Sequence, residues 1–422
     1  MHVAHFIHRY PPAIGGAEGY FARLSEFHAS HSDDVIVWTT TAVDLAAMWH
    51  SGKREVDSAE VLRTSPKVEI RRYRPLHFPA RRYVLKALTF VPHRTLQALA
   101  MPCNPVCPGM WRDAAQYDGP LDAVHASAFP YAFPIVCGLR LARRRKVPFL
   151  LTPFLHLGDP TNSHDRMRKQ YTSGPLRWLL RQADRVFVQT PSEQQAAHGL
   201  GVPMGKIVLQ GLGVEPSECT GGDRQAARKR WGIRSDEFVV GHLANLSEEK
   251  GTVDLLRAAQ KCWKEGEPIR VVLGGPSMPN FEHYWKSLGT KDTFLVTRLG
   301  VLTDSEKRDF FASLDVFALP SRTDSFGLVL LEAWANGLPV VAYRAGGPAD
   351  LVRDVEDGFV VDCGDVEKLG FSLWYLFKMD AARRLFGEMG RERVERDFRW
   401  DDKLRIVRET IRNLRQSPVT SP

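Results

Sequence analysis

The stretch from Pro320 to Val341 places carboxylates, small residues and a helix start within one short segment. The apolar run Val316–Leu319 predicts a buried strand, and a polar turn follows it. Helical periodicity from Phe326 to Ala335 then ends at an Asn-Gly pair. The first N–H groups of a helix have no intrahelical partners, and together with the helix dipole they bind phosphate. Because Gly327 lets an anion approach the backbone closely, the segment predicts a phosphate site.

Asp324 and Glu332 lie eight positions apart in this segment. Asp324 falls in the loop before the expected helix and Glu332 about two turns inside it, so the two carboxylates could address different parts of one ligand. Taken singly, Asp324 (or Ser325) is better explained as an N-cap and Glu332 as a solvated helix residue. Taken together, the residues from Ser321 to Glu332 favour a ligand site.

Short apolar runs rich in β-branched and aromatic residues alternate with helical segments in two series. The expected strands are 3–8, 34–40, 123–126, 148–153 and 185–189 in the first series, and 238–244, 270–274, 294–299, 316–319, 339–343 and 359–361 in the second. Buried strands separated by helices predict parallel sheets, so the fold class is α/β with two Rossmann-like doubly wound domains. A stretch rich in Gly, Pro and polar residues, 213–222, marks the boundary. We expect residues 1–212 to form the first domain and 213–399 the second, with a basic helix at about 400–416 packing back on the first.

Composition and charge favour a globular protein of two domains. With 422 residues the chain suits two domains, and its 44% hydrophobic and 25% charged residues are typical of globular proteins. Its apolar stretches are far shorter than the roughly 20 residues that cross a bilayer, and its N-terminus does not resemble a secretion signal, so we expect a cytoplasmic protein. Residues 1–210 carry 26 Lys and Arg against 16 Asp and Glu, about +10, whereas the remainder carries 31 against 33, about −2. A solvated basic surface explains this imbalance, and so does a first domain that meets an anionic membrane or a phosphorylated acceptor.

The basic segment from Arg71 to Arg94 mixes cations with aromatic and aliphatic residues. Two explanations stay open. The segment could lie at an anionic membrane interface, peripheral to the inner face of the membrane, or it could be a helix that packs its apolar face on the sheet. The basic residues form no recognised nucleic-acid-reading motif, so we expect no nucleic-acid partner.

Neither the cysteines nor the carboxylates form a metal-binding pattern. Cys103 and Cys107 are the closest pair of six scattered cysteines, but prolines surround them and no second Cys/His pair lies nearby. Free thiols are therefore expected rather than a zinc site. The chain contains no Asp-x-Asp sequence, so we expect no bound metal and no cofactor.

Six motifs together carry a resemblance to a known family. The segment that holds Asp324 and Glu332 resembles the E-x7-E signature of retaining glycosyltransferase family 4 (group 1), which has the GT-B fold. Five further motifs resemble those of the family in the same order: Tyr10-Pro-Pro-Ala-Ile-Gly-Gly-Ala-Glu18, Pro191-Ser-Glu, Gly211-Leu-Gly-Val-Glu-Pro, Leu246-Ser-Glu-Glu-Lys-Gly251 and Gly346-Gly347-Pro-Ala-Asp-Leu. The similarity covers nearly the whole chain. It implies two domains facing each other across a cleft, with the acceptor bound by the first and the sugar nucleotide by the second.

The resemblance also implies a role for individual residues. The implied catalytic residues are Asp324, Glu332, His156 and Lys250, and the implied donor-binding residues are Gly15, Gly16, Asn245, Lys250, Ser325, Phe326, Gly327, Leu328, Val329 and Glu332. Glu332 would bind the ribose hydroxyls and Asp324 the hydroxyls of the transferred sugar, while residues 326–329 would offer backbone N–H groups. Lys250 would neutralise the departing β-phosphate, as a divalent metal does in other transferases. Gly15 and Gly16 would let a loop of the first domain close on the phosphates or the acceptor.

His156 follows an expected strand and matches a family histidine near the reacting sugar, although a lone histidine in such a position is often structural. Two positions depart from the family pattern. The family usually has Glu where Asp324 stands, so the contact with the sugar could be shifted by one methylene. It often has Arg where Asn245 stands, which leaves more of the phosphate charge to Lys250.

The sequence therefore predicts a metal-independent retaining glycosyltransferase that moves a hexose from a UDP- or GDP-linked donor to a hydroxyl acceptor. The acceptor would be a glycan or a lipid-linked molecule, in glycolipid, polysaccharide or other glycan biosynthesis. Two alternatives remain: a GT-B sugar-nucleotide epimerase, and a non-catalytic sugar-nucleotide-binding protein. The second alternative is kept open by Asp324 and Asn245.

Overall fold

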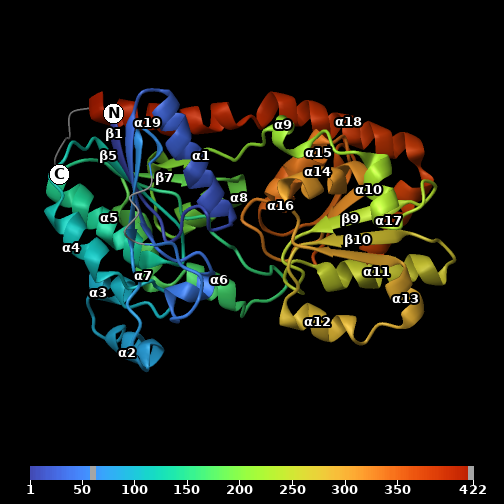
Figure 1. Cartoon of the computed structure of the whole chain (residues 1–422), viewed down its shortest axis with the longest axis horizontal. Coiled ribbons are helices and arrows are strands. Elements are labelled where there is room, and N and C mark those ends of the chain that lie inside the picture. Colours follow the sequence, from blue (N-terminus) through green and yellow to red (C-terminus); the bar gives the residue numbers. More distant parts are fainter. Residues whose placement is uncertain (58–62, 417–422) are drawn as a thin grey trace. The chain divides into compact units, whose positions relative to one another are not determined.

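The chain forms two α/β units, each built on its own sheet (Figure 1). The computed structural model describes residues 1–57 and 63–416. The first unit comprises Met1–Leu155, Lys169–Gln210 and Leu404–Pro422, and the second comprises His156–Arg168 and Gly211–Lys403. The short segment 156–168 thus belongs with the second unit, although the first unit surrounds it in sequence.

The sheet of the first unit has the strand order β3-β4-β2-β1-β5-β6-β7-β8, and every neighbouring pair is parallel except β3 with β4. The strands are β1 (His2–Phe6), β2 (Asp34–Thr40), β3 (Arg63–Ser65), β4 (Val68–Tyr73), β5 (Ala123–Ala126), β6 (Phe149–Leu151), β7 (Arg185–Val188) and β8 (Ile207–Leu209). Among its helices are α1 (Gly16–Ser30), α2 (Arg81–Leu88), α3 (Arg94–Leu99), α4 (Pro108–Gln116), α5 (Ala132–Arg145), α7 (Gly174–Gln182) and α8 (Pro191–Gly199), while α6 (Arg166–Tyr171) crosses the boundary between the units.

The C-terminal helix α19 (Trp400–Gln416) crosses the same boundary and ends in the first unit. Its Arg408 forms an ion pair with the buried carboxylate of Asp33, at 2.7 Å, and Arg415 pairs with Asp122 at 3.1 Å. Asp33 also accepts hydrogen bonds from His28 and from the α-amino group of Met1. These contacts attach α19 to the edge where β1 and β2 begin.

The sheet of the second unit is parallel throughout and has the order β11-β10-β9-β12-β13-β14. Its strands are β9 (Val239–Leu243), β10 (Arg270–Gly274), β11 (Val296–Gly300), β12 (Val316–Leu319), β13 (Val340–Tyr343) and β14 (Gly358–Val361). Its helices are α9 (Pro216–Cys219), α10 (Arg224–Arg230), α11 (Thr252–Lys264), α12 (Pro279–Trp285), α13 (Thr290–Phe294), α14 (Asp304–Ser313), α15 (Leu328–Ala335), α16 (Gly346–Leu351), α17 (Val366–Lys378) and α18 (Asp380–Asp397). Successive strands run outward from β9 on one side and from β12 on the other, so the order reverses between these two strands.

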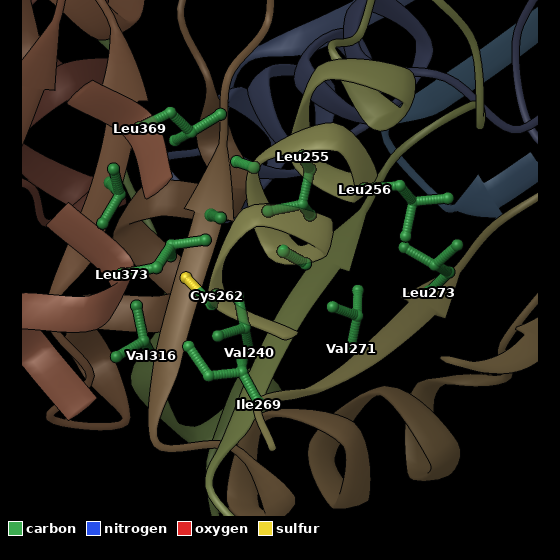
Figure 2. Close-up of a cluster of buried hydrophobic side chains, with 14 of the residues drawn as sticks. Val240, Leu255, Leu256, Cys262, Ile269, Val271, Leu273, Val316, Leu369 and Leu373 are labelled. Carbon is green, nitrogen blue, oxygen red and sulfur yellow. The ribbon is translucent and has the colours of Figure 1, made fainter. Parts of the chain in front are cut away.

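Apolar strands of the second unit bury both faces, as expected of a parallel sheet. Figure 2 shows the core on the face of the sheet that α11 and α17 cover. Val240 and Val271 point from the strands toward Leu255 and Cys262 of α11, and Leu373 of α17 completes the cluster. All these side chains are buried. This packing fixes α11, and with it the loop that precedes the helix, against β9.

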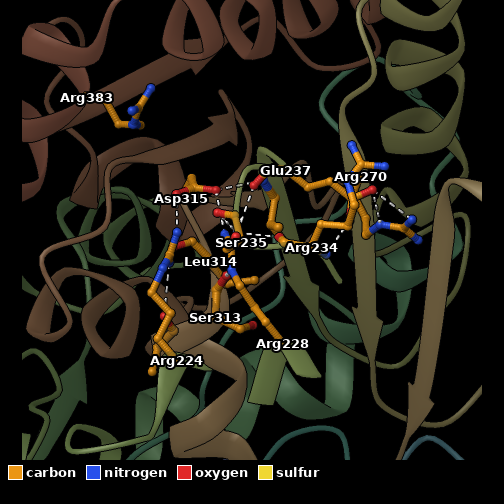
Figure 3. A network of polar contacts seen from close by, with 12 residues as sticks. Arg224, Arg228, Arg234, Ser235, Glu237, Arg270, Ser313, Leu314, Asp315 and Arg383 are labelled. Carbon is orange, nitrogen blue, oxygen red and sulfur yellow. Dashed lines mark hydrogen bonds and ion pairs between the residues drawn. The ribbon is translucent and has the colours of Figure 1, made fainter. Parts of the chain in front are cut away.

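A buried arginine ties the starts of β9 and β12 together (Figure 3). The guanidinium of Arg228 on α10 donates to four backbone carbonyls, those of Ser313, Arg234, Ser235 and Glu237, at 2.9–3.2 Å. It also pairs with Asp315 at 2.9 Å, and Asp315 in turn accepts the N–H of Val239 at 2.8 Å. Because Asp315 directly precedes β12 and Val239 opens β9, this network sets the relative position of the two central strands.

The parallel-sheet architecture predicted for both halves is present. Four strands match the expected bounds, namely β2, β5, β10 and β12. The sequence prediction missed β3, β4 and β8, and the basic segment 71–94 is not one helix, since its first residues end β4 and α2 begins at Arg81. Among the described residues, no helix is both long and apolar enough to span a bilayer.

We predict that Arg228→Leu lowers the free energy of unfolding by about 3–5 kcal/mol, because it leaves several backbone carbonyls without their buried donor and removes one of the two guanidinium partners of Asp315. Chemical denaturation monitored by circular dichroism measures the loss. Arg234→Ala is the matched control, since the Arg234 side chain pairs with Asp236 in solvent and its removal should leave stability unchanged. Equal stability of the Arg228 variant and the wild type would contradict the role given to this network.

Candidate functional site

The carboxyl ends of β9 and β12 mark the natural ligand position of the second unit. In open α/β sheets, ligands bind outside the carboxyl ends of the strands where the strand order reverses. Here the order reverses between β9 and β12. The loops that follow these strands, 244–251 and 320–327, hold Asn245, Lys250, Asp324 and Ser325. Topology alone therefore places much of the predicted donor set at one edge of one sheet.

Lys250 and Asp324 connect the two loops directly. The Lys250 ammonium donates to Asp324 Oδ2 at 2.7 Å and to the carbonyl oxygen of Thr323 at 3.2 Å. Asp324 Oδ1 accepts the backbone N–H of Phe326 at 3.3 Å. Burial acts to raise the pKa of Asp324, but the charge and hydrogen bond of Lys250 outweigh it and leave this pKa below its ordinary value. The Asp324 side chain is therefore ionised near neutral pH. It fixes the Lys250 ammonium group between the two loops.

Close backbone packing between the loops requires glycine at several positions. Gly251 adopts a φ of +73°, and a Cβ there would collide with the carbonyl oxygen of Pro320. Gly346 has a φ of +54°, and a Cβ would collide with the carbonyl oxygen of Asp324. At Gly347 a Cβ would meet the backbone of Phe326, and the Gly347 N–H donates to the Asp324 carbonyl at 2.9 Å. The "G-G" turn thus supports the loop that carries Asp324.

Helices α11 and α15 both begin after a left-handed glycine at this edge, Gly251 and Gly327, and neither has a side-chain cap. By contrast, Thr303 caps α14 and Asp365 caps α17. The first turn of α15 also lacks an acidic residue. Its N-terminus therefore keeps the positive partial charge and the N–H donors that bind an anion. Leu328 and Val329 supply the first of these N–H groups, Phe326 packs its side chain into the core, and Ser325 is half-buried.

Glu332 lies one turn into α15, and one oxygen of its carboxylate is bound by a lysine. Lys307 of α14 donates to Glu332 Oε1 at 2.7 Å. The second carboxylate oxygen, Oε2, is buried and has no hydrogen-bond partner among the described residues. A buried, unpaired carboxylate oxygen is costly unless a ligand supplies a donor. The lysine thus orients Glu332 and leaves one oxygen available to a hydroxyl group.

His156 belongs to the second unit and lies close enough to Lys250 and Asp324 for both charges to affect it. Burial, then the charge of Lys250, lowers the pKa of His156 to about 4 against the opposing effect of Asp324. The imidazole is therefore neutral near pH 7 and can exchange hydrogen bonds with a sugar hydroxyl. The backbone just before His156 is fixed by two features. Phe154 adopts a φ of +51°, and the Glu193 carboxylate accepts the N–H of Leu155 at 2.7 Å.

The structure thus brings Lys250, Asp324 and His156 together, and it sets Glu332 on the helix whose N-terminus faces the same edge. Asn245 is exposed in the loop that carries Lys250. Each of these assignments remains a prediction as to function.

Three residues with a clear positioning role were missed by sequence reasoning. Lys307 orients Glu332, and Arg322 binds both Asp159 and Asp254 through its guanidinium. Arg322 thereby ties segment 156–168 to the loop after β12. The third is Glu193, whose carboxylate accepts the backbone N–H groups of Leu155 and Gln189. The Pro191-Ser-Glu motif contains this residue but does not predict these contacts. The partners of Lys307 and Arg322 lie 25 to 163 positions away, so no local pattern links them.

Gly15 and Gly16 lie in the first unit, where the strand order reverses between β1 and β5. They open α1, and the Glu18 carboxylate occupies the space that a side chain at Gly15 would fill. Although burial opposes it, His8 and Arg9 lower the pKa of Glu18 to about 2. Arg9 pairs with Glu18 at 2.6 Å. At Gly16 an added Cβ would meet no atom within 4 Å, so that glycine leaves open space beside the helix start.

Comparison with known proteins identifies the family. The profile described as "Glycosyl transferases group 1" matches residues 223–393, and the one described as "Glycosyl transferase 4-like domain" matches residues 15–213. The chain belongs to the group 1 glycosyltransferases. Together the two profiles cover most of both units.

Individual relatives agree with this placement. A D-inositol 3-phosphate glycosyltransferase of Stackebrandtia nassauensis is 31% identical over 262 residues, which is 58% of each chain. The chain thus spans a little over half the length of that relative. A 2-deoxystreptamine N-acetyl-D-glucosaminyltransferase of Streptomyces fradiae is 26% identical over 85% of this chain and 81% of its own. The crystal structure of Anabaena Alr3699/HepE in complex with UDP superposes with a TM-score of 0.70 at 19% identity, covering 98% of this chain and all of the other. The fold is GT-B.

We predict that Gly251→Ala destabilises the protein and displaces the Lys250 loop, because the new methyl group would collide with the Pro320 carbonyl. Gly266→Ala is the matched control: Gly266 has a similar φ of +84°, but nothing lies within 4 Å of its Cβ position. The control should lose about 1 kcal/mol of unfolding free energy from backbone strain alone, and Gly251→Ala clearly more. Equal losses in urea unfolding would show that the close approach is not a constraint.

Proposed function

We propose that this protein transfers a hexose from a nucleotide sugar to a hydroxyl acceptor, with retention of anomeric configuration and without a divalent metal. The observation that carries the proposal is the arrangement at the edge of β9 and β12. There an ammonium group, an uncapped helix N-terminus and an oriented carboxylate lie where α/β sheets bind nucleotides. Membership of the group 1 glycosyltransferases supports the same chemistry.

The diphosphate of the donor would bind between Lys250 and the start of α15. Two of the three N–H donors of Lys250 have acceptors among the described residues, Asp324 and Thr323, so one remains for a β-phosphate oxygen. As the bond between the anomeric carbon and the β-phosphate oxygen breaks, negative charge collects on the departing nucleoside diphosphate. The ammonium group and the helix dipole stabilise that charge, which is the task of a metal ion in other transferases.

Glu332 would bind the nucleoside, because its Oε2 has no partner among the described residues and can accept a hydrogen bond from a ribose hydroxyl. We propose a UDP- or GDP-linked donor. The hydroxyls of the sugar would meet the carboxylate of Asp324 and the neutral imidazole of His156. Because the Asp324 carboxylate already binds Lys250, the β-phosphate of the donor and this carboxylate would both contact the Lys250 ammonium group.

The acceptor would be a glycan or a lipid-linked molecule bound by the first unit, where Gly16 leaves space beside the start of α1. Its hydroxyl oxygen would form the new bond to the anomeric carbon. We propose retention because the spacing of Asp324 and Glu332 is that of the retaining family. A sugar-nucleotide epimerase or a non-catalytic binder would share the donor site, but the family match favours neither.

We predict that Glu332→Ala lowers kcat/KM for the donor about 100-fold, since a charge-assisted hydrogen bond to the ribose is lost. Lys307→Met should lower it about tenfold, chiefly through KM, because Glu332 then lacks its orienting partner, and Lys307→Arg should restore most of the loss. The measurement is release of nucleoside diphosphate with each candidate donor, and proton NMR of the product reports its anomeric configuration.

Glu356→Ala serves as control, because Glu356 lies on an exposed turn of the same unit and pairs only with Arg353 among the described residues. Full activity of Glu332→Ala would refute the site. Stoichiometric binding of a nucleotide sugar without any turnover would favour the non-catalytic alternative.

A further inference from the structure

The chain contains a long stretch without any acidic residue. From Arg71 to Arg112, 42 consecutive residues include eight Lys and Arg but no Asp or Glu. All of these residues are described by the structure, and α2, α3 and the start of α4 lie among them. Arg71, at its start, pairs with Glu69, but a basic stretch of this length still produces a local positive potential. Figure 1 shows α2 at the margin of the first unit, away from the strands of its sheet.

Helix α2 is held to the rest of the unit by a single stripe of side chains. Arg81 and Leu85, one turn apart, are its buried residues. The Arg81 guanidinium donates to the carbonyl oxygens of Pro102 and Asn104. Beyond the helix, Gln97 donates to the Thr89 carbonyl at 3.1 Å. These contacts fix the orientation of α2 and leave the rest of its circumference in solvent.

The exposed part of α2 is divided into an apolar side and a basic side. At 100° per residue, Tyr83, Val84, Ala87 and Leu88 form one continuous arc. Tyr83 is 75% exposed, and Phe90, just past the helix, is 78% exposed. With Leu76 and Val91, this region holds six of the 17 large hydrophobic side chains that are exposed among the described residues. A cluster of this kind is costly in water and marks a surface that binds something apolar.

The basic side of the same helix carries Arg82 and Lys86, one turn apart, and Arg94 lies at the start of α3. All three are exposed, and among the described residues none forms an ion pair with a carboxylate. Their charges are therefore available to an anionic partner. Apolar side chains next to unpaired cations on one helix are the pattern of a helix that lies in a membrane interface.

We propose that this surface, formed by α2 and residues 89–94, docks on an anionic lipid bilayer. Tyr83, Leu88 and Phe90 enter the boundary between headgroups and acyl chains, while Arg82, Lys86 and Arg94 bind the phosphates. A nucleic acid would match the cations but not the apolar arc. A second copy of the same basic surface would repel it. The proposal does not depend on the transferase activity, although a bound bilayer would bring a lipid-linked acceptor to the first unit.

The test is co-sedimentation of the full chain with phosphatidylcholine vesicles that contain phosphatidylglycerol, at low salt. The wild type should bind these vesicles, should bind pure phosphatidylcholine vesicles much less, and should dissociate as salt is raised. Arg82→Gln with Lys86→Gln should weaken partitioning roughly 25-fold, about fivefold for each cation. Tyr83→Ser with Phe90→Ser should weaken it at least about tenfold through lost apolar burial.

The matched control is Lys291→Gln with Phe294→Ser, which removes an exposed cation and an exposed aromatic ring from α13 in the second unit. This control should bind vesicles as the wild type does, and circular dichroism should show all variants folded. Failure of the wild type to bind anionic vesicles would overturn the proposal. So would equal binding by the α2 variants, or concentration-dependent dimerisation that the α2 substitutions abolish.

Discussion

Backbone-to-backbone contact at the carboxyl edge of the second sheet is the constraint on which the candidate site depends. The loop after β9 touches the loop after β12 at Gly251, and the turn after β13 touches that same loop at Gly346 and Gly347. A side chain at any of these glycines would push the loops apart. Only this close approach allows Lys250, from one loop, to reach Asp324, on the other, at 2.7 Å. Because protein interiors are close-packed, a shift of any one of these three segments would displace the other two.

The electrostatics of the site follow from the same geometry. Lys250 keeps Asp324 ionised and contributes to keeping His156 neutral, so a cation, a carboxylate and an uncharged imidazole coexist within a small volume. On α15, Lys307 holds one oxygen of Glu332 and leaves the other unpaired. Lys250 and Glu332 are thus each oriented by a partner and keep part of their hydrogen-bonding capacity for a ligand, as a preorganised binding site requires.

Much of the fold could be predicted from the sequence because the buried strands are continuous apolar runs. Val316–Leu319 and Arg270–Gly274 were predicted with the bounds they have. By contrast, β4 was missed because its alternating pattern, with buried Val68 and Ile70 between polar residues, lies in a segment dominated by basic residues. The candidate site could be predicted only where its residues lie in local motifs. Lys307 and Arg322 act on partners distant in sequence, so their roles depend on tertiary contacts that no local pattern encodes.

The central claim is that the edge of β9 and β12 binds a nucleoside diphosphate without a metal ion. Calorimetric titration of the full chain with UDP and with GDP, in buffer containing a chelator of divalent cations, tests it most directly. We expect one site per chain for one of the two nucleotides, with affinity lowered at least about tenfold by Lys250→Met and by Glu332→Gln. Binding that needs an added divalent cation, or that both substitutions leave unchanged, would contradict it.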